Sequence, residues 1–446
     1  MNRYCYKTIY SKTLQRIVVV AEHARGEGKA GRSNITTYPI ADSFCTLRQL
    51  SWRIALATGS LLIQPLAQAQ IVADPQATRE HQPQVLLSTE QLPQVDIQTP
   101  SAAGVSVNEY RQFDVGEEGA LLNNSRKGAP THTGGWVSGN PNLIKGEAQV
   151  IVNQVNSSDP SQLRGQIEVA GQKADVIMAN PAGISVNGGG FINAGKTWLT
   201  TGSPQLEHGA FTGVNVERGT VHIGERGLDV RNSDYAAIIA KASKIDGPVQ
   251  AGDRPLDVIT GSNYVASDGK ITAKGGSNTG SANTAIDTGQ LGGMYGGSIR
   301  LISTDQGGGN YHYRYHGEDK GVETTGDGAL SVSASAGKLT VNAAKLNSGN
   351  NRVSLYGAKG IDVTHGEIID KEVTSSNHKG GGLFSRSRTR DYESWESHQV
   401  KSSDITGDSV TLVADRGNIN ATGSNIISEH GTLLHTNQGN IILKAG

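Results

Sequence analysis

The sequence predicts an all-β protein, and within that class a parallel β-helix, on three observations. Glycine accounts for 58 of the 446 residues, whereas there are only 5 Phe, 4 Trp and 3 Met, so a thick aromatic core is not expected. Short runs of alternating apolar residues are bounded by Gly, Asn or Asp, which tolerate left-handed turn geometry. Apolar pairs in the C-terminal part also recur at a nearly constant step.

The constant step sets the size of the predicted rung. Equivalent apolar positions are 21 or 22 residues apart: Val332 and Val353, Leu339 and Ile361, Leu412 and Leu434, Ile419 and Ile441. About two strands for each repeat of this length indicate a solenoid in which every rung covers its neighbour. A flat β-sandwich is the alternative, which the constant step disfavours. We therefore expect a right-handed parallel β-helix.

Two segments depart from the strand pattern. The stretch Tyr235–Ile245 (YAAIIAKASKI) is the one helix-like candidate, and it fits a pair of buried strands equally well. The stretch His378–Gln399 is charged, rich in Gly and Ser, and aperiodic. We interpret it as a loop or excursion from the solenoid, either a solvated insertion or a contact site.

The N-terminal 69 residues have the composition of an export leader. They hold nine of the 40 basic and three of the 41 acidic residues, which leaves 31 basic and 38 acidic residues after position 69. The apolar run Ile54–Ile63 ends in Ala67-Gln68-Ala69, the small-x-small pattern that signal peptidase accepts, so we expect cleavage before Gln70. The run is too short for a spanning helix, which needs roughly 20 residues. An N-terminal membrane anchor is the alternative. The mildly acidic body disfavours nucleic-acid binding.

Both cysteines, Cys5 and Cys45, lie in this leader, so the processed chain has none. A chain without crosslinks suits passage through the periplasm in an unfolded state. The segment before the signal resembles the extended signal-peptide region of very large autotransporters and two-partner secretion proteins. The resemblance rests on Met1-Asn2-Arg3, Tyr10-Ser11 and Val18-Val19-Val20-Ala21-Glu22.

Three further stretches resemble the secretion domain of two-partner secretion exoproteins, the filamentous haemagglutinin and contact-dependent inhibition family. They are Tyr110–Ser125, Asn140–Val155 and Leu163–Pro204. Within them, Asn140-Pro141-Asn142-Leu143 matches one hallmark of the family fully. Asn180-Pro181-Ala182-Gly183-Ile184 matches the second hallmark, except that Ala182 replaces an Asn. Leu291–Thr304 resembles a rung near the end of that domain, and Ser402–Ser428 resembles the haemagglutinin repeats.

The resemblance implies a partner. This would be an outer-membrane barrel transporter of the TpsB/CdiB type, with periplasmic POTRA domains. The candidate recognition or turn residues are Asn140, Pro141, Asn142, Leu143, Asn180, Pro181, Gly183 and Ile184. Asn-Pro pre-sets a tight turn, and Gly183 can take a positive φ. We expect an unfolded segment to add a strand to a POTRA sheet, and the chain to fold outside the cell. Replacing Asn140 or Asn142 is expected to abolish secretion without destabilising the purified domain.

The predicted function is that of a secreted adhesin or haemagglutinin, or of the N-terminal part of a contact-dependent growth-inhibition toxin carrier. A receptor on a host or neighbouring cell would be its second partner. We expect no enzymatic activity, cofactor or metal. The alternative is a polysaccharide-active, lyase-like β-helix enzyme, which needs clustered acids and a basic residue that do not stand out. In Tyr311–Asp319, His312 and His316 could approach a metal, but Arg314 between them opposes this.

These observations divide the chain into five parts. We expect an extended signal peptide over 1–69, with its extended region at about 1–30 and its signal at about 46–69. A secretion domain over 70–310 and β-helix rungs over 311–370 follow. An insertion over 371–401 precedes haemagglutinin-type repeats over 402–446. The fold would include N-terminal capping strands and extra-helical hairpins. Because Ile441–Gly446 lies in mid-repeat with no cap or toxin, we expect a truncated or split reading frame.

One motif points to a different function. The stretch Gly190–Thr197 (GFINAGKT) satisfies the P-loop pattern, in which Lys196 and Thr197 would hold phosphate and magnesium. A P-loop lies between a strand and a helix, whereas Gly202 and Pro204 follow here and leave no room for a helix. We interpret Gly188-Gly189-Gly190 as a solenoid turn and Phe191-Ile192 as the start of the next rung, and we expect no nucleotide binding.

Overall fold

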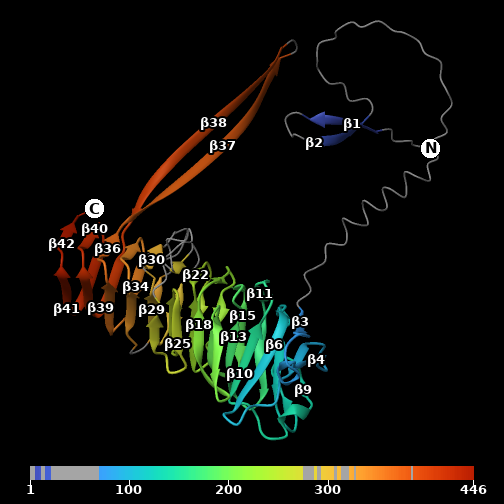
Figure 1. Cartoon of the computed structure of the whole chain (residues 1–446). Coiled ribbons are helices and arrows are strands. Elements are labelled where there is room, and N and C mark those ends of the chain that lie inside the picture. Colours follow the sequence, from blue (N-terminus) through green and yellow to red (C-terminus); the bar gives the residue numbers. More distant parts are fainter. Residues whose placement is uncertain are drawn as a thin grey trace, which may run out of the picture. The chain divides into compact units, whose positions relative to one another are not determined.

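The structure is a computed structural model that describes residues 6–11, 16–21, 70–274, 286–288, 293–305, 309–312, 321–325, 328–382 and 385–445 (Figure 1). Side chains are described within 70–274, 293–305, 321–325, 328–366 and 400–445. Ala67, Ala69, Leu291 and Arg314 lie outside the described residues, as does most of the leader. The side chains of His312 and of the stretch His378–Gln399 are not described either.

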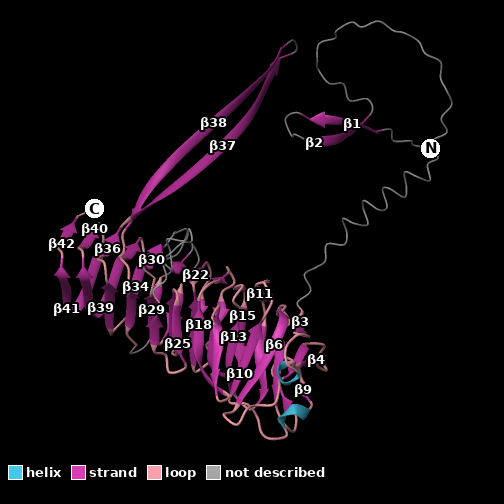
Figure 2. Ribbon diagram, viewed as in Figure 1, coloured by secondary structure: helices cyan, strands magenta, loops and turns pink. Residues whose placement is uncertain are grey.

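The chain forms two units. In the unit Met1–Leu66, β1 (Tyr6–Ser11) and β2 (Arg16–Ala21) pair antiparallel. The second unit, Ala67–Gly446, holds every other element. Helical structure in the described part is limited to two 3-10 turns, η1 (Arg79–His81) and η2 (Pro141–Leu143) (Figure 2). Neither of these short turns, nor any other part of the chain that the structure describes, forms a helix that could span a bilayer.

The second unit is a parallel β-helix with three strands in each rung. The first face consists of β6 (Val105–Phe113), β10 (Val150–Val155), β13 (Ala174–Ala179), β16 (Ala194–Thr200), β21 (Tyr235–Ala240), β24 (Pro255–Thr260), β29 (Ser298–Ser303), β32 (Leu330–Ala334), β35 (Arg352–Gly357), β39 (Asp404–Arg416) and β41 (Asn425–Gln438). The second face consists of β5 (Pro93–Asp96), β7 (Ala120–Asn124), β12 (Gln166–Gly171), β15 (Gly189–Ile192), β20 (Leu228–Asp229), β23 (Val249–Gln250), β28 (Met294–Gly296), β31 (Val322–Thr324) and β34 (Lys345–Asn347), and it continues into the first residues of β39.

The third face consists of two parallel sheets. The first holds β11 (Ser161–Leu163), β14 (Ile184–Val186), β19 (Thr220–Ile223), β22 (Ala242–Ile245) and β27 (Ile286–Thr288). The second holds β30 (Gly309–His312), β33 (Leu339–Asn342), β36 (Ile361–Thr364), β40 (Ile419–Thr422) and β42 (Ile441–Lys444). The expected parallel β-helix is therefore confirmed.

Stacked rungs place equivalent side chains in columns inside the solenoid. One column of the first face, in register from rung to rung, consists of Met178, Leu199, Ile238, Val258, Leu301, Val332, Leu355 and Leu412. Each of these side chains is buried. Because every member contacts the residues above and below it, the column favours aliphatic residues of similar size.

Antiparallel strands lie outside the rungs. They are β3 (Ile71–Ala73), which pairs with β6; β4 (Gln84–Leu87), which pairs with β5; β8 (Ala129–Pro130) and β9 (Trp136–Val137); β17 (Ser203–Glu207), β18 (Ala210–Val216), β25 (Asn263–Ala266) and β26 (Ile271–Ala273); and β37 (Gly366–Gly382) and β38 (Ser385–Lys401). The sheet β17-β18-β25-β26 covers a second apolar core, which includes Trp198 and Ile259 on the outer side of the first face. The hairpin β37–β38 extends from the solenoid between β36 and β39 (Figure 1).

The structure corrects two details of the predicted repeat. Each rung has three strands, whereas the sequence predicted about two. The third strand escaped prediction because strands such as β34 bury a single apolar residue, here Leu346, and show no alternation. Val332 pairs with Leu355, and Leu330 with Val353, so the step is 23 residues and the predicted match of Val332 with Val353 is wrong. Alternation alone cannot distinguish two registers that differ by two residues, since both keep the same side chains inside.

The helix-like stretch Tyr235–Ile245 forms two strands, β21 and β22. Its first half shows no alternation because both faces of β21 are buried. Ile238 belongs to the solenoid core, whereas Ile239 belongs to the second core under the antiparallel sheet. Of the two interpretations left open by the sequence, the pair of buried strands is confirmed.

The column arrangement predicts where truncation is costly. Replacing Leu355, which is 1% exposed, with alanine leaves a cavity that its column neighbours cannot fill. We expect the free energy of unfolding to fall by about 2–5 kcal/mol. The same truncation of Leu206, an exposed residue of β17, should change it by about 0.5 kcal/mol or less. Urea unfolding followed by circular dichroism measures both, and equal midpoint shifts for the two variants would contradict the column.

Candidate functional site

The two Asn-Pro motifs form turns of the same geometry. In the first, Asn140 Oδ1 accepts a hydrogen bond from the Asn142 backbone N at 2.9 Å. In the second, Asn180 Oδ1 accepts from the Ala182 backbone N, also at 2.9 Å. Each turn is closed by a backbone bond to the carbonyl of its asparagine, from Leu143 N at 3.2 Å and from Gly183 N at 3.0 Å. The proline fixes φ while the asparagine side chain closes the loop on itself.

The side chain of Asn140 also joins this turn to the N-terminal cap and to β7. It is 3% exposed, and its Nδ2 donates to the carbonyls of Ile97 and Asn123, at 2.9 Å each. The side-chain oxygen and both amide hydrogens are therefore all used. Since buried polar groups are costly when they lack a partner, Asn140 has a structural role. The expectation that its replacement leaves the folded domain stable therefore needs revision.

Asn180 has the same role in a different place. It is fully buried, and its Nδ2 donates to Asp159 O at 2.9 Å and to Ser161 Oγ at 3.0 Å. Its backbone N donates to Thr200 O at 2.9 Å, so this turn is held between β11 and β16. The two motifs thus have different neighbours, and each fixes its own corner of the solenoid.

Substitution of Ala182 for the family's asparagine leaves the second turn intact, because the turn uses only the backbone N of that residue. The equivalent Asn142 adds a side-chain bond, from Nδ2 to Ile97 O at 3.1 Å. Gly183 has φ +132°, and a Cβ there would lie 3.1 Å from Thr220 O, so glycine is required. Ile184 and Leu143 are buried in the solenoid core.

The exposed part of the first motif lies just beyond the residues that the sequence singled out. Ile144 is 79% exposed, and Pro141 and Lys145 are also exposed. Ile144 could have been identified from the sequence, because it is an apolar residue that follows a hallmark motif and lies outside the alternating pattern. This loop therefore presents an apolar side chain beside a cation at the end of the solenoid that bears the N-terminal cap.

The residues that match the P-loop pattern lie in two consecutive strands of the solenoid. Gly190 lies within β15, and Lys196 and Thr197 lie within β16, so no helix follows the loop. Thr197 is buried, and its Oγ1 lies 2.8 Å from Ser233 Oγ. The predicted turn at Gly188-Gly189-Gly190 is also shifted. Only Gly188 has a positive φ, +94°, whereas β15 begins at Gly189 and Phe191-Ile192 ends it.

The nearest cation to that turn is already paired. A Cβ at Gly188 would lie 2.8 Å from the guanidinium of Arg226. Arg226 donates to the carboxylate of Glu117, and this hydrogen bond lowers the pKa of Glu117. This pair joins two exposed side chains that are far apart in the sequence.

One group of potential metal ligands occurs among the described residues. Asp408, Glu429 and His430 each offer an atom within 4.8 Å of the others. Glu429 and His430 are exposed, and His430 Nδ1 is bonded to Asp408 Oδ1. The three residues lie on adjacent rungs, in β39 and β41, and two of them are exposed.

Comparison with known proteins identifies the family. Residues 69–332 match the family model of the TPS secretion domain, and residues 1–39 match that of the extended signal peptide of the type V secretion system. The chain therefore belongs to the TPS secretion domain family, that of the two-partner secretion exoproteins. These matches indicate export across the inner membrane and secretion to the cell surface.

Curated relatives agree with this assignment. A toxin CdiA of Yersinia pestis is 42% identical over 348 residues, which cover 77% of this chain and 10% of that protein. The tRNA nuclease CdiA-2 of Burkholderia pseudomallei is 36% identical over 349 residues, with the same coverage. The chain thus spans about a tenth of the length of these relatives. Their toxin and nuclease activities are statements about those proteins.

A solved structure supports the fold. The crystal structure of a filamentous hemagglutinin secretion domain is 24% identical, with a TM-score of 0.51, and the match covers 84% of this chain and 99% of that one. At this identity the likeness concerns the β-helix itself.

The buried bonds of Asn140 predict a cost for its removal. In Asn140→Ala, the carbonyl of Asn123 and the backbone N of Asn142 lose their partner. We expect the free energy of unfolding to fall by about 1–3 kcal/mol. Asn140→Asp keeps the acceptor but places a carboxylate oxygen against the carbonyls of Ile97 and Asn123, so it should destabilise the domain at least as much. Asn350→Ala, on an exposed turn, is the control. Urea unfolding of the purified chain measures each, and an unchanged midpoint for Asn140→Ala would refute the structural role.

Proposed function

We propose that this chain is the secretion-directing part of a two-partner secretion exoprotein, exported through a dedicated outer-membrane barrel transporter of the TpsB/CdiB type with POTRA domains. The observation that carries the proposal is the TPS secretion domain match over residues 69–332, preceded by the extended signal peptide over residues 1–39. The parallel β-helix supports it, because such a chain can fold rung upon rung as it emerges.

The proposed recognition elements are Asn140, Pro141, Asn142, Leu143, Asn180, Pro181, Gly183 and Ile184. In the unfolded chain their amide groups, and the extended segments beside them, would be free to bind the transporter. An extended segment would add a strand to a POTRA sheet edge, where backbone hydrogen bonds give affinity and side chains give register. We add Ile144 to this set because it has no packing role in the folded domain, where it is 79% exposed.

After export, the chain would act as an adhesin or haemagglutinin, or as the N-terminal part of a contact-dependent growth-inhibition toxin carrier. The similarity to CdiA proteins over 77% of the chain favours the carrier role. In either role the chain would bind a surface receptor on a host or neighbouring cell. We assign no enzymatic activity to this chain, because a secretion domain family accounts for most of its length.

The proposal keeps the division expected from the sequence. The signal peptide occupies 1–69 and is cleaved after Ala69. The secretion domain occupies 70–310, and further rungs occupy 311–370. The insertion at 371–401 corresponds to most of the hairpin β37–β38, and haemagglutinin-type repeats occupy 402–446.

The recognition role predicts a secretion defect without a stability defect. Asn142 is half-buried and Ile144 is exposed, so Asn142→Ala and Ile144→Ser should alter the folded domain little. In cells that carry the cognate transporter, we expect the secreted fraction to fall about tenfold, as a loss of ~1.4 kcal/mol in transporter binding would give. Immunoblots of medium and cell fractions measure this, with urea midpoints of the purified variants in parallel.

Asn350→Ala is the matched control, since it removes an exposed turn asparagine between β34 and β35. It should be secreted as the wild type is. Wild-type secretion of both Asn142→Ala and Ile144→Ser would remove this loop from the recognition site.

A further inference from the structure

The ladder between β39 and β41 is interrupted at one corner of the solenoid. Its register shifts between Gly407 and Ser409, so that one residue of β39, Asp408, lies opposite two residues of β41, Glu429 and His430. A bulge of this kind redirects the side chains next to it, and bulges are frequent beside functional sites. The three side chains therefore come together, although Asp408 and His430 are 22 residues apart in the sequence.

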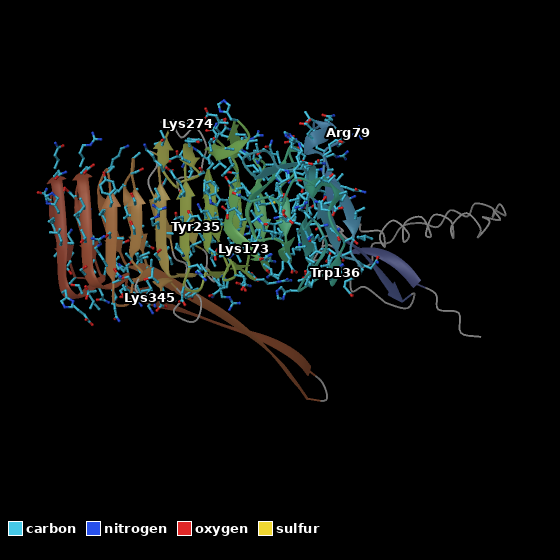
Figure 3. The ribbon with its side chains drawn as sticks, turned by 90° about the horizontal axis from the view of Figure 1, so that it is seen from below. Arg79, Trp136, Lys173, Tyr235, Lys274 and Lys345 are labelled. Carbon is cyan, nitrogen blue, oxygen red and sulfur yellow. The ribbon has the colours of Figure 1, made fainter. Side chains whose placement is uncertain are left out.

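The position of Asp408 is fixed by the neighbouring rung. β39 begins on the second face, where Asp404 pairs with Lys345 of β34, and it continues on the first face beside β35. Lys345 is labelled in Figure 3 and identifies the rung that precedes this corner. The backbone N of Asp408 donates to Asn351 O at 2.8 Å, which ties the corner to that rung.

The three residues present the donor set of a zinc site. Each offers one ligand atom, a nitrogen from His430 and an oxygen from each of Asp408 and Glu429, and these atoms lie within 4.8 Å of one another. Imidazole nitrogen together with carboxylate oxygen suits Zn²⁺, which commonly binds three protein ligands and a water in an open site. Hard cations such as Ca²⁺ prefer oxygen ligands alone.

One contact within this group is already made. His430 Nδ1 is bonded to Asp408 Oδ1, so the imidazole is held beside the carboxylate. A divalent ion can take the place of the proton between them, because both groups are metal ligands when they are deprotonated. Glu429 is exposed, so its side chain can move toward an ion at little cost.

The charges at this corner also favour a cation. The two carboxylates lie close enough to repel each other, and within the described residues neither forms an ion pair with Lys or Arg. In the same part of the chain, Glu429 has no hydrogen-bond partner. The side chains of Asp408 and His430 are 35% and 74% exposed, so an ion can reach them from solvent.

We propose that Asp408, Glu429 and His430 bind a zinc ion that joins two adjacent rungs. The ion crosslinks β39 to β41 at the corner where the backbone ladder is interrupted. The chain has no cysteine after residue 69, so a metal crosslink takes a role that a disulfide could have had. Because its ligands meet only when the rungs are stacked, this crosslink forms after folding and does not hinder passage of an unfolded chain.

The test is isothermal titration calorimetry of the purified, untagged chain with ZnCl₂. We expect one ion to bind with a Kd on the order of 10 µM, since three ligands on an open surface bind less tightly than a closed four-ligand site. Asp408→Ala, Glu429→Ala and His430→Ala should each weaken binding at least about tenfold. Circular dichroism confirms that each variant is folded.

His435→Ala is the matched control. His435 is another exposed histidine of β41, and its Nε2 is bonded to Asn437 Oδ1 at 2.8 Å, outside the proposed site. This variant should bind Zn²⁺ as the wild type does. A loss of binding equal to that of His430→Ala would show that the ion is held by exposed histidines in general, which overturns the proposal.

The crosslink also predicts a readout besides affinity. Zn²⁺ at a hundred times its Kd should lower the unfolding equilibrium constant of the wild type roughly hundredfold, and it should leave the urea midpoint of Asp408→Ala unchanged. Absence of Zn²⁺ binding, or unchanged binding by all three site variants, overturns the proposal. Binding of CaCl₂ as tight as that of ZnCl₂ overturns the assignment to zinc.

Discussion

The whole solenoid depends on one constraint: each rung must pair its backbone with the rung before it and place side chains of compatible size above one another. Columns such as Ile238, Val258 and Leu301 satisfy it with aliphatic residues that differ by little more than a methylene group. Fully buried aromatic rings are few in this core. Tyr110 and Phe113 lie in β6, at the end where the cap begins, with their centroids 4.8 Å apart, and Phe191 of β15 lies within the stack, in register with Ile167.

The same constraint leaves the outside of the rungs free to vary. Where β17, β18, β25 and β26 cover the first face, outward residues such as Trp198 and Ile259 are apolar and form a second core. Farther along this face the outward positions become polar, as at Ser331 and Ser354, which pair in register. Additions such as β8–β9 therefore need only a few matching outward side chains, and they create cavities at their borders without disturbing the stack.

The sequence was sufficient to predict the class of fold, because alternation and a constant step follow directly from stacked rungs. Prediction from the sequence failed at the corners of the rungs. Strands as short as β34 carry one buried residue and no periodicity, so the third strand of each rung was missed. The register of Val332 was wrong by two residues, since inward positions two apart are equivalent in pattern. The burial of Asn140 could not be read from its motif either, because its partners Ile97 and Asn123 lie 43 and 17 residues away.

The structural role of the Asn-Pro motifs is compatible with the recognition role that we propose for them, because the two belong to different states of the chain. In the unfolded chain the amides of Asn140 and Asn180 would be available to a transporter. In the folded domain every hydrogen-bonding group of the Asn140 side chain is used within the turn and its neighbours. Folding outside the cell would thus remove the signal that the transporter binds. On the proposed route this makes export directional without a chemical energy source, because the folded product has lost the extended segment and the free amides that its return would require.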